Sequence, residues 1–226
     1  MRKITRTALT ATAVAATTVA LTASPASAAV TSVDIDPTGS NISITATNVG
    51  NVIGANDRTG AALVCTSLVA QGEIPSGGPG LSPTGIAKVT SVTFSGCTVL
   101  GNPAVATANV SAANPWMLDV TDVTSGGETP GQLRGVDIHI SVPALGCESD
   151  ANGAGTAVGI LPGIHVDRSG PGAPSQLKLP PPPNQGDNIE LENVNDDCPD
   201  DIAADGDSVS VAGNLEITPG LTVLAT

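Results

Sequence analysis

The segment from Leu133 to Val142 alternates between apolar and polar residues, and this pattern limits the fold more than any other part of the chain. Its apolar residues stand at every second position: Val136, Ile138, Ile140 and Val142. Successive side chains of an extended chain point to opposite sides, so the pattern predicts a β-strand with one buried and one solvent-facing side. An amphipathic helix would instead repeat its apolar residues every three or four positions.

Other segments repeat this alternation: Ser32–Asp36, Asn41–Thr47, Trp116–Thr121, Asn188–Val194 and Ser208–Ile217. The first two are expected to form a hairpin, and we find no helical periodicity after residue 28. Short strands with frequent turns between them predict an all-β fold, an antiparallel β-sandwich or barrel-like sandwich of about ten strands. We expect residues 29–226 to form a single domain, because dividing them would leave pieces with poor cores.

Two further expectations concern the middle of the chain. The segment Gln71–Gly85 is rich in Gly, Pro and Ser, which predicts a loop. In the following strand, Val89 is out of phase with Val92 and Phe94. A β-bulge near Thr90 and Ser91 would restore the alternation.

The first 28 residues have the features of a signal peptide. Arg2, Lys3 and Arg6 form a basic start, Ala8–Ala23 is uncharged and largely apolar, and Ala26–Ala28 supplies the small residues of a cleavage site. We therefore expect cleavage after Ala28 and a secreted protein, either extracellular or associated with the cell envelope. No other long apolar run follows, so no transmembrane span is expected in the mature chain.

The expected mature chain is strongly acidic. Removal of the three leader cations leaves five basic residues against 21 acidic ones, a net charge of −16. Binding of nucleic acid depends on Lys and Arg side chains that neutralise phosphates. This composition therefore excludes nucleic acid as a partner.

Aromatic residues are nearly missing, since the chain has one Trp, one Phe and no Tyr. Val, Ile, Leu and Ala must then form the core. Trp116 is expected to belong to that core because it alternates in phase with Leu118 and Val120. Such a core benefits from covalent cross-links.

Four cysteines can supply these cross-links: Cys65, Cys97, Cys147 and Cys198. An even number in an exported chain predicts disulfides, and no Cys-x-x-Cys pair suggests a metal or redox site. Three pairings are open, and we favour the sequential one, Cys65–Cys97 with Cys147–Cys198. Loops of these lengths give roughly 3.5–4 kcal/mol of stabilisation each.

Several motifs resemble those of a known group of proteins: Val64-Cys65-Thr66, Val89–Thr98, Asn114-Pro-Trp116, the strand Gly131–Ile140 and Gly146-Cys147. As a set they cover most of the mature chain and resemble a group of secreted actinobacterial proteins of unknown function. The resemblance implies export, a four-cysteine framework and an all-β fold. It carries over no catalytic or binding residue.

The two histidines suggest one metal site. Asp137 and His139 are expected on the solvent-facing side of one strand, and His165 and Asp167 on that of another. If these strands pair, the four side chains form a set that suits zinc. The alternative is two ordinary pairs of surface neighbours.

The acidic segment Asp187–Asp207 suggests a second metal site. Carboxylate oxygens of this kind can bind calcium, and the tentative ligands are Asp196, Asp197, Asp200, Asp201, Asp205 and Asp207. The segment departs from the helix-loop-helix calcium loop because Cys198 stands where Gly is required and no Glu follows at the right distance. A solvated acidic loop is the alternative.

Catalytic motifs are not found: there is no Gly-x-Ser-x-Gly elbow, His-Glu-x-x-His or phosphate-binding Gly loop. We therefore expect a non-enzymatic binding or structural protein of the cell surface or extracellular space. The alternatives are a calcium- or zinc-binding secreted protein and a hydrolase of an unrecognised type. No other cofactor is expected, and the partner is unknown, with a cell-envelope component or another protein as candidates.

Overall fold

A computed structural model of the chain describes residues 29–155, 157–179 and 188–226, so the predicted signal peptide lies outside the described residues. The described residues form thirteen strands and one short 3-10 helix, η1 (Pro143–Leu145). The strands are β1 (Val33–Asn56), β2 (Ala62–Leu81), β3 (Ala87–Val99), β4 (Asn102–Ala108), β5 (Trp116–Val120), β6 (Glu128–Arg134), β7 (Ile138–Val142), β8 (Cys147–Gly153), β9 (Ile160–Val166), β10 (Ser175–Leu179), β11 (Ile189–Glu192), β12 (Val209–Thr218) and β13 (Thr222–Ala225). This confirms the all-β antiparallel fold.

Eight strands close into a barrel in the order β3-β2-β1-β12-β10-β9-β6-β5, and β5 returns to β3. Only the first part of β3 pairs with β5, through Ala87–Val89, whereas its second part pairs with β4. From β4 the sheet continues through β7 and β8 to β11. A bridge between Glu190 and Ser208 then brings β11 beside the start of β12.

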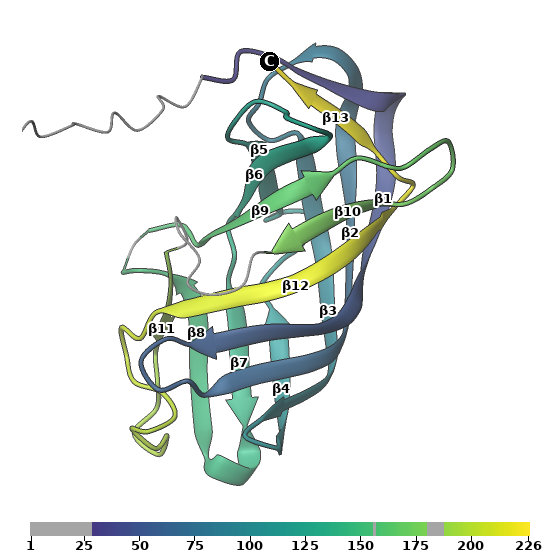
Figure 1. Ribbon diagram of the computed structural model, residues 1–226. Coiled ribbons are helices and arrows are strands. Elements are labelled where there is room, and N and C mark those ends of the chain that lie inside the picture. The colour runs from purple at the N-terminus through teal and green to yellow at the C-terminus, as the bar shows by residue number, and fades with distance from the viewer. Residues whose placement is uncertain (1–28, 156, 180–187) are drawn as a thin grey trace, which may run out of the picture.

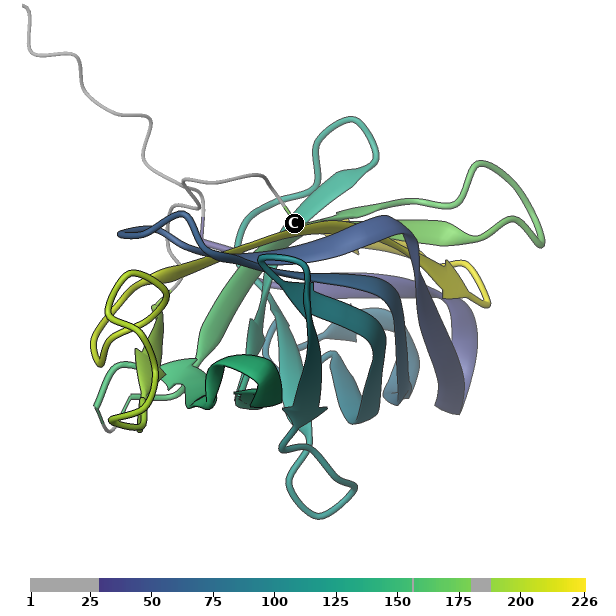
Figure 2. The ribbon, with the colours of Figure 1, turned by 90° about the horizontal axis from the view of Figure 1, so that it is seen from below.

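The long strands β1, β2, β3 and β12 therefore form part of the sheet at both ends of the molecule (Figure 1). We call the end formed with β5, β6, β9, β10 and β13 the β13 end. We call the end formed with β4, β7, β8 and β11 the β11 end. The view from below shows the curved long strands on one side and the shorter strands opposite them (Figure 2).

The segment predicted as one strand, Leu133–Val142, is broken in the structure. β6 ends at Arg134, Gly135 has a positive φ of 89°, and β7 begins at Ile138 on the other end of the molecule. The backbone N–H groups of Gly135 and Val136 donate to the carbonyl of Gly159, at 2.9 and 3.2 Å. The connection from β6 to β7 thus passes the connection from β8 to β9 at this point. The alternation of residues alone could not reveal this crossing.

Two other expectations about strand boundaries were wrong. Val33–Asn56 is one strand and not a hairpin, and β2 continues to Leu81 through most of the predicted loop. Register shifts between Ile35 and Gly39 accommodate the Gly- and Pro-rich part of β2. A Cβ on Gly77 would lie 2.3 Å from the Pro37 carbonyl oxygen, so this glycine allows close strand packing and does not mark a turn.

The predicted bulge is confirmed, because Gln71 pairs with Ser91 and Gly72 with Val89, which leaves Thr90 as the extra residue. Trp116 is a core residue, only 4% exposed. Within the described residues, no helix has the length and hydropathy needed to cross a membrane.

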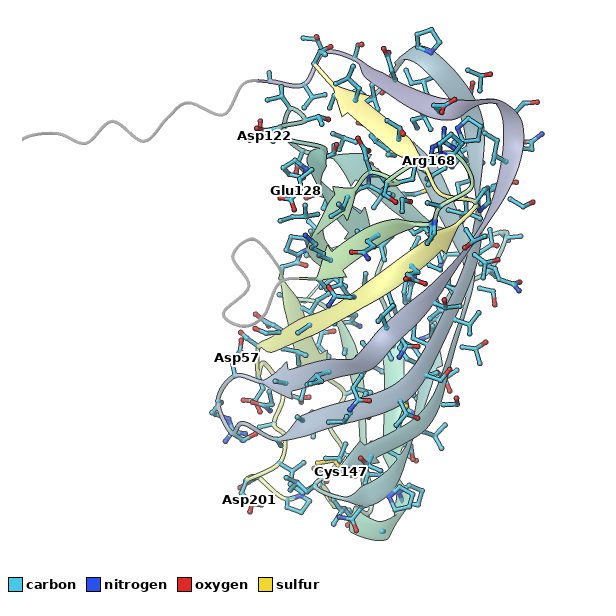
Figure 3. The ribbon with its side chains drawn as sticks, turned by 45° about the vertical axis from the view of Figure 1, so that its right-hand side comes forward. Asp57, Asp122, Glu128, Cys147, Arg168 and Asp201 are labelled. Carbon is cyan, nitrogen blue, oxygen red and sulfur yellow. A yellow bond between two sulfur atoms is a disulfide. The ribbon has the colours of Figure 1, made fainter. Side chains whose placement is uncertain are left out.

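Both predicted disulfides are present, Cys65–Cys97 and Cys147–Cys198. The first joins directly paired residues of β2 and β3. The second joins the start of β8 to the segment between β11 and β12. Figure 3 shows Cys147, Asp57 and Asp201 toward the β11 end.

Candidate functional site

The interior of the protein contains a cavity of about 210 Å³, and its lining residues come from the barrel strands and from the β11 end of the molecule. Its wall is formed almost entirely by aliphatic side chains from the long strands and the short strands facing them. Ala46 and Ala70 explain part of this space, because they are direct partners across β1 and β2 and both line the cavity. Larger aliphatic residues at these two interior positions would fill it.

Trp116 lines this cavity from the start of β5. Its indole Nε1 is buried and has no hydrogen-bond partner among the described residues. The polar side chain of Asn56 also reaches the cavity wall, but its amide donates to the Ile202 carbonyl at 3.2 Å and to Asp207 at 2.7 Å. Among the described residues the Trp116 N–H is therefore an unpaired donor beside a largely apolar space.

A second, smaller cavity of about 50 Å³ lies at the β13 end. Ile44, Leu118, Leu177 and Ile217 line both cavities, so the two spaces are direct neighbours. The small cavity differs from the large one because His165 forms part of its wall.

His165 lies on the interior side of β9, and its expected position on the solvent-facing side was wrong. The buried residues of β9 are Leu161, Gly163 and His165. Because the glycine interrupts the apolar alternation on this side, the sequence pattern did not reveal that the interior side includes His165. Neither imidazole nitrogen has a hydrogen-bond partner among the described residues. Burial lowers the pKa of His165, although the nearby Asp167 carboxylate opposes this effect.

The structure does not bring the four residues of the predicted zinc site together. β7 and β9 are not neighbours in the sheet, and His139 Nδ1 instead lies 2.8 Å from Asp150 Oδ1. Asp137 accepts a hydrogen bond from Asn109 at 3.0 Å, and Asp167 accepts one from the N–H of Val223 at 2.8 Å. Across residues 29–155, 157–179 and 188–226, no three His, Cys, Asp or Glu side chains are placed to hold a metal ion.

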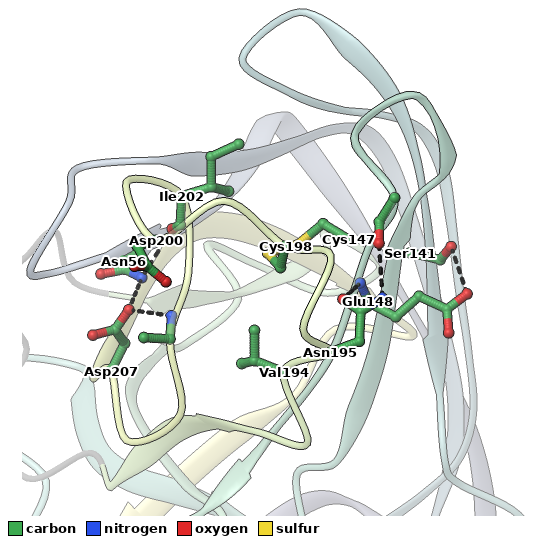
Figure 4. Close-up of a disulfide and its surroundings, with 12 residues drawn as sticks. Asn56, Ser141, Cys147, Glu148, Val194, Asn195, Cys198, Asp200, Ile202 and Asp207 are labelled. Atoms are coloured by element: carbon green, nitrogen blue, oxygen red, sulfur yellow. Dashed lines mark hydrogen bonds between the residues drawn. A yellow bond between two sulfur atoms is a disulfide. The ribbon is translucent and has the colours of Figure 1, made fainter.

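The described part of the acidic segment, residues 188–207, packs at the β11 end of the molecule (Figure 4). Ile202 and Ala203 from this segment are buried and line the large cavity. The Cys147–Cys198 disulfide holds one side of the segment. The side chain of Asn195 donates to the Gly146 carbonyl at 2.7 Å and accepts a hydrogen bond from the Glu148 N–H at 2.9 Å. The described part of the segment is therefore held against the rest of the protein by Cys198, Asn195, Ile202 and Ala203.

The carboxylates of the predicted calcium site have different surroundings. Asp207 is buried and accepts hydrogen bonds from Arg58, Asn56 and the Ala204 N–H, and those from Arg58 contribute most to lowering its pKa to about 2. Asp205 accepts a hydrogen bond from the Val194 N–H at 2.8 Å. The remaining four are exposed to solvent: Asp196, Asp197, Asp200 and Asp201. This arrangement gives the calcium prediction no converging set of ligands.

The fold and cavity define the class of this protein as an all-β barrel with an apolar interior space and two disulfides. Comparison with family models, with curated proteins and with solved structures found no match. The cavity is thus the feature from which a function can be argued. Sequence analysis missed it, and the signal was the presence of alanine at interior positions such as Ala46 and Ala70.

Proposed function

We propose that this is an exported, non-enzymatic binding protein that holds a small apolar molecule inside its barrel. The single observation that carries the proposal is the cavity of about 210 Å³ with an aliphatic wall. Apolar cavities of about 150 Å³ stay free of water and bind molecules such as benzene. Eight-stranded barrels are also known to enclose one small ligand.

The cost of leaving this space empty supports an occupant. Core substitutions that leave a cavity cost about 24 cal/mol per Å³ of cavity, and on that scale an empty space of this volume corresponds to about 5 kcal/mol. That is a large part of the total stability of a typical domain, about 5–15 kcal/mol. A ligand that fills the cavity would recover much of this free energy.

The chemistry of the wall favours binding over hydrolysis. Among the described residues that line the large cavity, none is an Asp, Glu, His, Lys or Arg. General acid–base catalysis needs such a group within hydrogen-bond reach of the substrate. Ser149 does reach the wall, but the two histidines lie elsewhere, so it has no adjacent base there.

Trp116 provides the test, because it is the only Trp, the chain has no Tyr, and its side chain lines the cavity. We would titrate the purified full chain with 1-bromooctane, whose bromine quenches indole fluorescence on contact. We expect saturable quenching with a dissociation constant in the high-micromolar to millimolar range, because eight carbons at about 0.8 kcal/mol each give about 6 kcal/mol before the cost of association is subtracted.

Two variants control this experiment. Ala46→Leu fills part of the cavity and should weaken binding, whereas Thr47→Leu adds the same side chain at the exposed neighbouring position of β1 and should not. Quenching that rises linearly without saturation, or that is the same in both variants, would show that the cavity is not the binding site.

A further inference from the structure

His165 is a buried polar group that the described part of the protein leaves without a hydrogen bond. The residue is 8% exposed and shares the wall of the small cavity with Thr129. The Thr129 hydroxyl donates to the Val223 carbonyl at 2.9 Å, whereas both imidazole nitrogens have no hydrogen-bond partner among the described residues. Buried polar groups nearly always have a partner, so we expect a molecule in the small cavity to provide one.

The imidazole limits what that molecule can be. Burial lowers the pKa of His165, so the ring is neutral at neutral pH and presents one donor and one acceptor. The two ring nitrogens point away from each other, so one hydroxyl group binds only one of them, but it can bind either nitrogen because it both donates and accepts. A carboxylate can only accept, and an ammonium group can only donate.

The charges around the small cavity also disfavour an anion. Asp167 Oδ1 lies 3.5 Å from His165 Nδ1, and Asp119, which is paired with Arg134, lines the same cavity. The whole chain carries a net charge of −13. An ionised group of either sign would also lose its water on entering this largely apolar space.

The two cavities together suit a slender chain. Their shared wall, which includes Ile44 and Leu118, places the small cavity at one end of the large one. Since about 150 Å³ holds the six carbons of benzene, volumes of 210 and 50 Å³ correspond to about ten carbon and oxygen atoms in all.

We infer that the ligand is a neutral aliphatic alcohol whose hydroxyl group binds His165 in the small cavity while its chain fills the large cavity. This inference rests on the proposed function and adds the chemical class of the ligand. A single buried water is the competing source of hydrogen bonds for His165, and the experiment separates the two.

The test compares three ligands of one chain length in the full-length protein: 8-bromo-1-octanol, 1-bromooctane and 8-bromooctanoate, each detected by quenching of Trp116. The variants are His165→Leu, which removes both polar atoms, and His165→Gln, which keeps one donor and one acceptor. His165→Leu should fold, because it removes an unsatisfied buried polar group, and circular dichroism verifies this.

We expect His165→Leu to weaken binding of 8-bromo-1-octanol roughly tenfold or more and to leave the affinity for 1-bromooctane unchanged. His165→Gln should retain most of the binding of the alcohol. If the two ligands respond alike to His165→Leu, or if 8-bromooctanoate binds the unsubstituted protein best, the inference is wrong while the proposed function stands. If 1-bromooctane and the alcohol both fail to bind the unsubstituted protein, the proposed function itself fails.

Discussion

Arg58 and Asp207, 149 residues apart in the chain, form a two-point ion pair at the β11 end of the barrel. Arg58 Nε donates to Oδ1 at 2.5 Å, and Nη2 donates to Oδ2 at 2.7 Å. The same Nη2 donates to the Asp200 carbonyl at 2.9 Å. This guanidinium therefore holds the acidic segment on the turn between β1 and β2, with Ile202 facing the cavity.

Loss of the Asp207 charge should destabilise the protein in a pH-dependent way. Its pKa of about 2 in the folded state is below the ordinary value of 3.8, so its stabilisation is present above about pH 4 and is lost as the pH falls through about 2. We expect Asp207→Asn to lower the free energy of unfolding by about 1–3 kcal/mol at pH 7. Urea denaturation of both proteins from pH 7 to pH 2 should show this difference shrinking, and a constant difference would contradict it.

The two disulfides should have separable effects. They close loops of 32 and 51 residues, so replacing either pair with serine should cost about 4 kcal/mol. That loss corresponds to a decrease in melting temperature of about 8–16 °C. Calorimetry of the two double variants, Cys65→Ser with Cys97→Ser and Cys147→Ser with Cys198→Ser, measures this.

Only the second pair should also change the rate of ligand release, because Cys198 belongs to the segment that closes the cavity whereas Cys65–Cys97 links two long strands. Stopped-flow recovery of Trp116 fluorescence after dilution of bound 1-bromooctane gives this rate. Equal release rates in both variants would contradict a closing role for the acidic segment.

Burial of neutral His165 should make stability fall in mild acid. The folded-state pKa is lowered, so below about pH 6.5 the unfolded chain binds a proton that the folded protein does not, and stability decreases by up to about 1.4 kcal/mol per pH unit. The charged groups around this ring are Asp167 just after the end of β9, the Asp119–Arg134 pair, and the outer Glu128–Lys178 pair of the neighbouring strands. His165→Leu should flatten the dependence between pH 5 and 7, and an unchanged slope would assign it to another group.

Gly159 should not tolerate a side chain. A Cβ there would lie 2.1 Å from the Val136 carbonyl oxygen, at the point where the two connections between the barrel ends pass. We expect Gly159→Ala to cost about 3 kcal/mol or more, as measured by chemical denaturation. Gly170→Ala is the matched control, since a Cβ there has no neighbour within 4 Å, and it should change stability by less than about 0.5 kcal/mol.

Several local features could be predicted from the sequence because they depend on neighbouring residues. The alternation of Trp116 with Leu118 and Val120 indicated a buried strand, and the phase shift at Val89 placed a bulge near Thr90 and Ser91, where Thr90 is the extra residue. The favoured sequential pairing of the cysteines is also present. Each of these inferences needed only the chain's own spacing.

Features that depend on distant segments could not be predicted in this way. Gly135 breaks the alternating segment because its φ is positive and because Gly159 meets it from another part of the chain. His165 faces the interior because the register of β9 with β6 and β10 places it opposite Thr129 and Leu177. The cavity arises where Ala46 meets Ala70, a pairing that only the sheet register defines.

The pairing of β1 has a consequence for the order of folding. One edge of β1 pairs with β2, which follows after a short turn. The other edge pairs with β12, far along the chain, where Thr45 lies opposite Thr218. Contacts between such distant positions form slowly, so a partly synthesised chain carries a long, unprotected strand edge. Until β12 has been synthesised, the free edge of β1 can pair with a strand of another copy of the chain. Folding of this protein should therefore depend on keeping growing chains apart.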